Sequence, residues 1–446
     1  VPKLQLGNIA LGKPIMTTEN GPQVAPSASS SSPLLGRLSL MMFLQYFVQG
    51  SYLPIASVYV QDALGFTSMQ VGIFSSALAV GPILAPFVIG QLVDRMFATE
   101  RVMAFCHLLG GVLMLALCVQ SEVWPVIVLG TVYSVLYVPT MMLSNSLAFQ
   151  HLRNSDMEFP WVRLFGTLGF IVPAYLVEFW WLRGLEGEAL DHARAFAFAL
   201  SGIAGIVMAF YCLSLPHTPA LKREDRKYAP GVVISMLRSR HLLVLVVVSF
   251  LIAIAHQFVV VWYSPFMREI LDTGGWGAYE QSISSIGQVC ELGVLAVLGL
   301  MIKKLGFKRT LLLGVTAYTL RCLLFTLVFS LDLPFEGMLA IAAAGQALHG
   351  FCFGCFLAVA YIYVDRIAPR DVRGSMQTLY GTFVVALGFF VGGFVSGQVG
   401  QWFTSGAGET LTRDWTSIWL SCTALCALCV VIFATLFPSK LPEKAE

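Results

Sequence analysis

Residues 241–266 read HLLVLVVVSFLIAIAHQFVVVWYSPF, a run of 26 residues that contains no Asp, Glu, Lys or Arg. A helix needs about 20 predominantly apolar residues to cross the hydrocarbon core of a bilayer. Lipid offers no hydrogen-bond partner to the backbone, so a segment in lipid must satisfy its own peptide groups. The run therefore predicts a membrane-spanning α-helix.

The rest of the chain has the same character. Of its 446 residues, 57% are hydrophobic and 12% are charged, and the mean hydropathy is +0.77. A soluble protein carries about 25% charged residues because its surface faces water. Reading outward from the first run gives twelve predicted spans in all. They lie near 38–60, 69–93, 102–119, 123–148, 159–182, 195–215, 241–266, 281–301, 309–330, 335–363, 374–399 and 414–437.

The basic residues indicate how these spans are oriented. Most of the 27 Lys and Arg residues fall in alternate loops, which is typical of the cytoplasmic side. With the N-terminus inside, Arg163 and Arg321 fall within spans, and the remaining exceptions lie in loops on the outer side. Those exceptions are Arg183, Arg194, Arg268 and Arg413. We expect both termini to be cytoplasmic.

The chain divides into two halves of six spans at the polar stretch HTPALKREDRKYAPG, residues 217–231. A short basic turn follows the second span of each half, at 90–102 and at 298–310, as related halves would predict, although tight cytoplasmic loops are often basic in any case. The prediction is an all-α membrane protein with five parts. These are a disordered polar tail (1–36, in which Met16 would make a natural start), a six-helix half (37–216), a cytoplasmic linker (217–240), a second six-helix half (241–438) and a C-terminal tail (439–446).

Several function classes lack their usual motifs. The net charge of +2 does not favour nucleic-acid binding, and no GxxxxGKS/T segment is present for ATP-driven transport. HExxH and GxSxG are also absent, so we expect no enzyme. The pair Cys352 and Cys355 lies in an apolar run without a second ligand pair, so we expect packing rather than redox or metal chemistry, with no metal and no cofactor.

Polar residues inside the spans are candidates for function, because they are costly at membrane depth. Arg163, Thr167 and Phe170 are spaced four and then three apart, so they share one face of the fifth span. That face could bind and stack on a ligand, or Arg163 could instead pair with Asp156 or Glu158. Nearer the outer end of the same span, Glu178 is expected to snorkel to water.

The eighth span carries Gln288 and Glu291 on one face. Glu291 is the carboxylate deepest in the second half, and burial there would let it hold or release a proton near neutral pH. The alternative is a structural pair with Arg321 on the next helix. Further inward candidates are His256, Gln257, His349 and Phe353.

These residues belong to segments that resemble a known family. Gly90-x-x-x-Asp94-Arg95 resembles the loop signature of the major facilitator superfamily, here with only Arg101 left of its downstream part. Over roughly 38–437 the chain is similar to the bacterial nucleoside:proton symporters of that superfamily. The best marks are FLQYFVQGSY (43–52), YVPTMMLSNSLAFQHLRNSDM (137–157), FPWVRLFGTLGF (159–170) and QVCELGVL (288–295).

The resemblance implies a cavity between the halves that binds ribose and base, with a proton as the coupling ion, Glu291 as the coupling residue and Gly90, Asp94 and Arg95 as a conformational loop. It also implies a multi-pass, monomeric protein of the bacterial inner membrane, embedded in lipid. The implied nucleoside contacts are Arg163, Thr167, Phe170, Gln257, Gln288, Glu291, His349 and Phe353.

Three positions depart from the family pattern. Val260 stands in place of Asn, His349 in place of Tyr and Gly354 in place of Asp. The missing Asp leaves Glu291 to carry the proton, with His349 or His256 as helpers, or else the substrate range differs. Two alternatives therefore stay open. One is a transporter or facilitator of the same fold for a sugar, nucleobase or conjugate, and the other is a membrane receptor or scaffold without turnover.

The predicted topology can be tested by labelling engineered cysteines in intact cells, with the parent protein as the background. Lys227→Cys and Lys444→Cys should react only after the membrane is opened, and Gly184→Cys and Gly406→Cys should react from outside. A single reversed label would contradict the arrangement of six plus six spans, because every later loop would change sides.

Overall fold

The computed structural model describes residues 32–92, 97–219, 239–368, 376–377, 379–406 and 411–438. The elements of the first half lie end to end along the chain, with short turns between them. They are α1 (Ser32–Tyr52), η1 (Leu53–Ile55), α2 (Ala56–Val58), η2 (Tyr59–Ala63), α3 (Ser68–Leu78), α4 (Val80–Leu92), α5 (Thr99–Cys118), α6 (Val123–His151), α7 (Ser155–Leu176), η3 (Val177–Leu182), α8 (Gly187–Ala193) and α9 (Ala195–Cys212).

The second half is built in the same way, with one short hairpin of two strands near its end. Its elements are α11 (Arg240–Thr273), α12 (Glu280–Ser330), α13 (Phe335–Ala347), α14 (His349–Phe351), η4 (Cys352–Ala358), α15 (Val359–Ile367), η5 (Tyr380–Ala386), α17 (Leu387–Trp402), β1 (Thr404–Ser405), β2 (Thr412–Arg413) and α18 (Trp415–Leu436). The strands β1 and β2 are antiparallel.

Within the described residues, ten helices are long and apolar enough to cross a membrane. One of them, α12, has 51 residues, which at 1.5 Å per residue is about 77 Å and more than twice the hydrocarbon thickness. Gly306 breaks α12 with φ 76° and ψ 168°, a backbone conformation that favours glycine. The break divides α12 at the boundary expected between two spans, 281–301 and 309–330. The total of twelve spans stays a prediction.

Two sequence-based boundaries can be compared with the helices. α1 begins at Ser32, so residues 32–36 are helical although we assigned them to the tail. α11 begins at Arg240, at the predicted end of the linker, and the side chain of Ser239 accepts a hydrogen bond from the amide of Leu242 at 3.2 Å. That bond is a typical N-cap. Residues 1–31, 220–238 and 439–446 lie outside the described residues.

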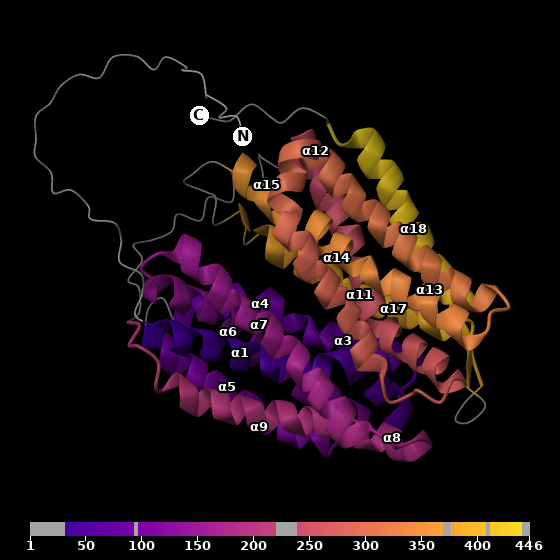
Figure 1. Ribbon diagram of the computed structural model, residues 1–446, viewed down its shortest axis with the longest axis horizontal. Coiled ribbons are helices and arrows are strands. Elements are labelled where there is room, and N and C mark those ends of the chain that lie inside the picture. The colour runs from indigo at the N-terminus through magenta and orange to yellow at the C-terminus, as the bar shows by residue number, and fades with distance from the viewer. Residues whose placement is uncertain are drawn as a thin grey trace, which may run out of the picture.

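The helices form two bundles that follow the two halves of the chain (Figure 1). In the first bundle, α1 packs against α7 and α9, and α5 packs against α6 and α9. In the second bundle, α11 packs against α17 and α18, and α12 packs against α13 and α18. The bundles meet most extensively where α3 contacts α17.

Glycines allow this contact between α3 and α17 to be made by backbone. A Cβ atom added at Gly72 would lie 2.4 Å from the carbonyl oxygen of Gly393 and 2.7 Å from the Cα of Gly397. One turn along α3, the Ser76 hydroxyl donates to the carbonyl of Phe390 at 2.8 Å. Small residues thus bring the two halves together at one place, as they do at other helix crossings in membranes.

A methyl group at this crossing should destabilise the protein. Gly72→Ala would force α3 and α17 apart, and overpacking of this kind costs about 1–3 kcal/mol. Gly299→Ala is the matched control, because no atom lies within 4 Å of the Cβ position there and alanine favours a helix by up to about 1 kcal/mol. Thermal unfolding in detergent should show a lower midpoint for Gly72→Ala and an unchanged or higher one for Gly299→Ala. Equal midpoints would contradict the crossing.

Candidate functional site

A cavity of about 140 Å³ lies between the two halves. One wall comes from the first half, through residues of η1 and α7. The other comes from the second half, through residues of α11, both arms of α12, α13 and α14. The polar residues of this second wall are His256, Tyr263, Ser264, Gln281, Ser284, Ser285, Gln288, Arg321, Gln346 and His349.

On the wall from the first half, α7 contributes Phe170, Ile171 and Ala174 to the cavity. α7 approaches α1 closely, since a Cβ at Gly50 would lie 2.2 Å from the carbonyl oxygen of Phe170. Arg163 lies two turns earlier on α7 and does not line the cavity. Its guanidinium carbon sits 4.2 Å from the ring centroid of Tyr46, a cation–π contact within the first half. Neither Thr167 nor Arg163 contributes to the lining in this conformation.

The wall from the second half contains two of the predicted contacts, Gln288 and His349. Gln257 lies elsewhere: it is buried and donates a hydrogen bond to the Ser75 hydroxyl, so it joins the two halves. The neighbouring His256 lines the cavity, and its Nδ1 lies 2.8 Å from the hydroxyl of Tyr318. Phe353 stands behind His349, with 6.3 Å between ring centroids.

Three charged or titratable side chains form a row at this wall. Nη1 of Arg321 lies 3.2 Å from Nδ1 of His349, and Nε2 of His349 lies 3.4 Å from a carboxylate oxygen of Glu291. A guanidinium can only donate, so Nδ1 of His349 must accept. The proton of a neutral imidazole then resides on Nε2, facing Glu291. The row thus places a donor beside the Glu291 carboxylate and an arginine behind that donor.

The row replaces the direct pair between Glu291 and Arg321 that the sequence left open, because the imidazole of His349 stands between them. Gly354, where related symporters carry Asp, is buried. A Cβ there would lie 2.8 Å from Cγ1 of Val294, so Val294 occupies the space that a larger side chain would need. Glu291 therefore contacts the cavity residue His349 without a second carboxylate at position 354.

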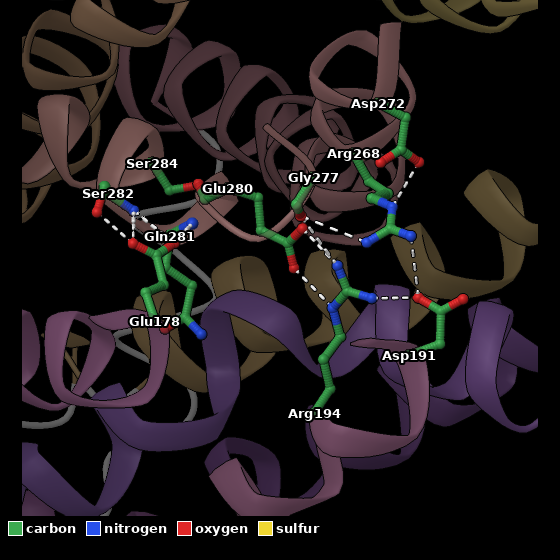
Figure 2. Close-up of polar contacts among 10 residues, drawn as sticks. All are labelled: Glu178, Asp191, Arg194, Arg268, Asp272, Gly277, Glu280, Gln281, Ser282 and Ser284. Carbon is green, nitrogen blue, oxygen red and sulfur yellow. Dashed lines mark hydrogen bonds and ion pairs between the residues drawn. The ribbon is translucent and has the colours of Figure 1, made fainter. Parts of the chain in front are cut away.

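Beyond the cavity, on the predicted outer side, buried polar residues connect the halves (Figure 2). Glu178 of η3 was expected to snorkel to water, and that expectation was wrong. Its side chain is 0% exposed and accepts hydrogen bonds from the amides of Gln281 and Ser282 and from the Ser282 hydroxyl. These amides are unpaired donors at the start of α12, so the carboxylate caps that helix from the other half.

A second bridge lies beside this cap. Nε and Nη2 of Arg194 donate to the two carboxylate oxygens of Glu280 at 2.9 and 2.8 Å, and both side chains are almost fully buried. Arg194 also contacts Asp191, which lies 3.4 Å from Nη2 of Arg268. The carbonyl of Gly277 accepts from both arginines, at 3.3 and 3.4 Å. Figure 2 shows these contacts together with the cap made by Glu178. We call the whole group the outer network, and its charged members are Glu178, Asp191, Arg194, Arg268, Asp272 and Glu280.

Some predicted features cannot be placed. Asp94 and Arg95 of the loop signature lie outside the described residues, as does the side chain of Asp156, whereas Gly90 lies near the end of α4. Glu158 has a contact of its own, since its carboxylate accepts from the amide of Asn154 at 3.2 Å. Arg163 is placed against Tyr46, as described above.

The sequence also missed a group of three thiols. The Sγ atoms of Cys322, Cys422 and Cys426 lie within 4.8 Å of one another in the core of the second half, although about 100 residues separate Cys322 from the others. Cys352 and Cys355 are both buried, as packing residues would be.

The comparisons with known proteins agree with this architecture. A sequence model of the family described as Nucleoside H+ symporter matches residues 34–441. The chain belongs to the nucleoside H+ symporter family. It is 27% identical to the xanthosine permease of Escherichia coli (strain K12) over 431 residues, which cover 92% of this chain and 98% of the permease. It is 23% identical to the nucleoside permease NupG of the same organism over 419 residues, or 91% of this chain and 96% of the permease.

Among solved structures, the fold matches the crystal structure of a mutant of the nucleoside transporter NupG. The TM-score is 0.82 at 21% sequence identity, and the match covers 91% of this chain and 100% of that chain. The predicted family and the predicted major facilitator fold are thereby confirmed. The symporter is a multi-pass membrane transporter rather than an enzyme.

The outer network gives a test of how the halves are held together. Arg194→Gln leaves the Glu280 carboxylate buried without its partner. This destabilises the closed arrangement of the halves by about 3–5 kcal/mol, and the halves can relieve the cost by parting and admitting water. Amides at the start of α12 should then exchange hydrogen at least about tenfold faster than in the unmodified protein. Hydrogen-exchange mass spectrometry of residues 279–285 measures this effect.

Arg183→Gln is the control for that measurement, because Arg183 is exposed and has no part in the outer network. The double variant Arg194→Met with Glu280→Leu should exchange more slowly than Arg194→Gln, since it removes both buried charges. Unchanged exchange in Arg194→Gln would contradict a role for this pair in holding the outer side closed.

Proposed function

We propose that this symporter imports nucleosides together with protons across the bacterial inner membrane, by exposing its cavity alternately to the two sides. The observation that carries the proposal is the row of Arg321, His349 and Glu291 at a cavity between two helical halves. Family membership supports the cargo and the coupling ion. Both termini would be cytoplasmic, as the distribution of basic residues led us to expect, and the unit would be monomeric, as the family resemblance implies.

The proposed nucleoside site uses residues from both walls. Phe170 offers an aromatic face to the base, and Gln288 and His349 offer hydrogen-bond groups to ribose hydroxyls. The present cavity of about 140 Å³ is smaller than the roughly 300 Å³ at which ligand pockets begin. Binding would therefore require the halves to move. Arg163, Thr167, Gln257, Glu291 and Phe353 would complete the site in that enlarged state.

Coupling to protons would reside in Glu291. When Glu291 is ionised, the Nε2–H of His349 faces its carboxylate, and Nδ1 of the same ring faces Arg321. When Glu291 takes up a proton, this attraction is lost and His349 becomes free to contact a ligand. Protonation and binding would thus affect each other, which is the requirement for a gradient to drive uphill uptake.

Alternating access would involve the outer network. Its bonds join the halves at Glu280, Gln281 and Ser282, beside the cavity, so separation of the halves on that side must break them. The closely packed crossing of α3 and α17 would remain as the place about which the bundles move. The conformational loop at Gly90, Asp94 and Arg95 remains a prediction from the sequence.

Glu291→Gln should abolish proton-driven accumulation of nucleoside, because glutamine cannot exchange a proton at that position. Glutamine keeps the shape and part of the hydrogen bonding, so movement of nucleoside down its own gradient should persist. The measurement is uptake into proteoliposomes with and without an imposed pH gradient, and the matched control is Glu336→Gln. Glu336 lies exposed in the first turn of α13, far from the row.

Two results would count against this assignment. If Glu291→Gln concentrates nucleoside as well as the unmodified protein does, the coupling residue lies elsewhere, and His349 is the next position to change. If the unmodified protein ignores the pH gradient, it is a facilitator, and coupling in this family would depend on the Asp that Gly354 replaces.

A further inference from the structure

The cavity contains a positive charge that has only neutral partners. Arg321 is 2% exposed; its Nη2 donates to the side-chain oxygen of Gln346 at 2.5 Å, and its Nη1 contacts Nδ1 of His349. Its guanidinium carbon also lies 5.8 Å from the ring centroid of Tyr263 and 5.5 Å from that of Phe325. No carboxylate among the described residues lies within 4.0 Å of this guanidinium.

A buried charge without an opposite charge is unfavourable, and neutral hydrogen bonds and ring faces offset only part of its lost hydration. The outer network shows how the other buried arginines of the described structure are paired. Arg194 contacts Asp191 and Glu280, and Arg268 contacts Asp191 and Asp272. Arg321 differs from Arg194 in lining the cavity. A ligand bound in the cavity could therefore supply the negative charge that Arg321 lacks.

Other atoms in the same cavity also lack partners. Nε of Arg321, the hydroxyl of Ser264 and both side-chain polar atoms of Gln281 are buried without a hydrogen bond within the described structure. Ser264 is 3% exposed and Gln281 is 1% exposed, and both line the cavity with Arg321. Buried polar groups are nearly always paired, so unpaired ones that face a common cavity indicate a ligand. This set can donate through a guanidinium, a hydroxyl and an amide.

We infer that the cavity recognises a nucleoside carrying a negative charge, and that the charged group binds Arg321 with Ser264 and Gln281 as further donors. The inference rests on the proposed nucleoside transport and makes its substrate class narrower. The charge of Glu291 does not prevent such binding, because the ring of His349 separates Glu291 from Arg321. Phe170, on the opposite wall, would then cover a neutral part of the ligand.

The test compares ligands that differ in charge and little else. Xanthosine carries an acidic dioxopurine that is largely ionised at slightly alkaline pH, and inosine is its neutral twin. Adenosine-5′-carboxylic acid carries its charge on the sugar, and adenosine is the neutral twin. Affinity is measured by titration calorimetry on the purified full-length protein. In at least one pair the anion should bind about ten- to a hundredfold more tightly, the range for hydrogen bonds to charged groups.

Variants then assign the preference to Arg321. Arg321→Gln should bring the anion and its neutral twin to within about twofold of each other, and Arg321→Lys should keep part of the preference because it keeps the charge. Arg309→Gln is the control: it removes one positive charge from an exposed position on the same helix and should leave the preference unchanged. If Arg321→Gln does not fold, Ser264→Ala and Gln281→Leu take its place, because neither removes a side-chain hydrogen bond present in the structure. Each should lower the affinity for the anionic ligand severalfold and leave the affinity for its neutral twin unchanged.

The outcomes separate this inference from the function on which it rests. Binding of neutral nucleosides with no advantage for either anion would overturn the inference and leave nucleoside transport intact. An advantage that persists in Arg321→Gln would also overturn it, and would return Arg321 to a structural role in holding Gln346 and His349. If no nucleoside of either charge binds, the proposed function itself fails.

Discussion

The bilayer cannot hydrate a charge or a peptide group, and the architecture of this symporter follows from that constraint. Apolar helices satisfy their own backbone, but the charged side chains at membrane depth must find partners inside the protein. In the described structure Arg163 lies against Tyr46 within the first half, and two further groups lie between the halves or face the space between them. Arg194, Glu280 and Glu178 form the outer network, and Arg321, His349 and Glu291 form the row at the cavity.

The two places differ in their balance of charge. In the outer network each arginine meets carboxylates, and Glu178 receives hydrogen bonds from the start of α12. For such buried pairs the cost of dehydration nearly cancels the attraction, so parting the halves and returning the charges to water changes the free energy little. A transporter needs this property, because neither of its two states can be much more stable than the other. At the cavity, by contrast, Arg321 and Glu291 lie on opposite sides of the His349 ring. A bound ligand or a proton can change the net charge there.

The sequence predicted those features that depend on length, hydropathy and local spacing. The run 241–266 lies within a single helix, and Gly306 lies between two expected spans. Family resemblance led to Phe170, Gln288 and His349, which line the cavity. Glu178 was misjudged, because a sequence gives the depth of a residue in the membrane but not which helix lies beside it. The role of Arg321 was missed for the same reason: its neighbours Gln346 and His349 are about 25 residues away and come together only through the packing of α12 against α13 and α14.

The crossing of α3 and α17 has a mechanical consequence. At Gly72, Gly393 and Gly397 the two helices are in contact through their backbones. These three positions carry no side chains, so none there would have to change rotamer if the angle between the helices changed. The hydrogen bond from the Ser76 hydroxyl to the carbonyl of Phe390 adds to the contact between the two helices. In the proposed movement of the halves, the glycines at this crossing would let α3 and α17 stay in contact while their angle changes.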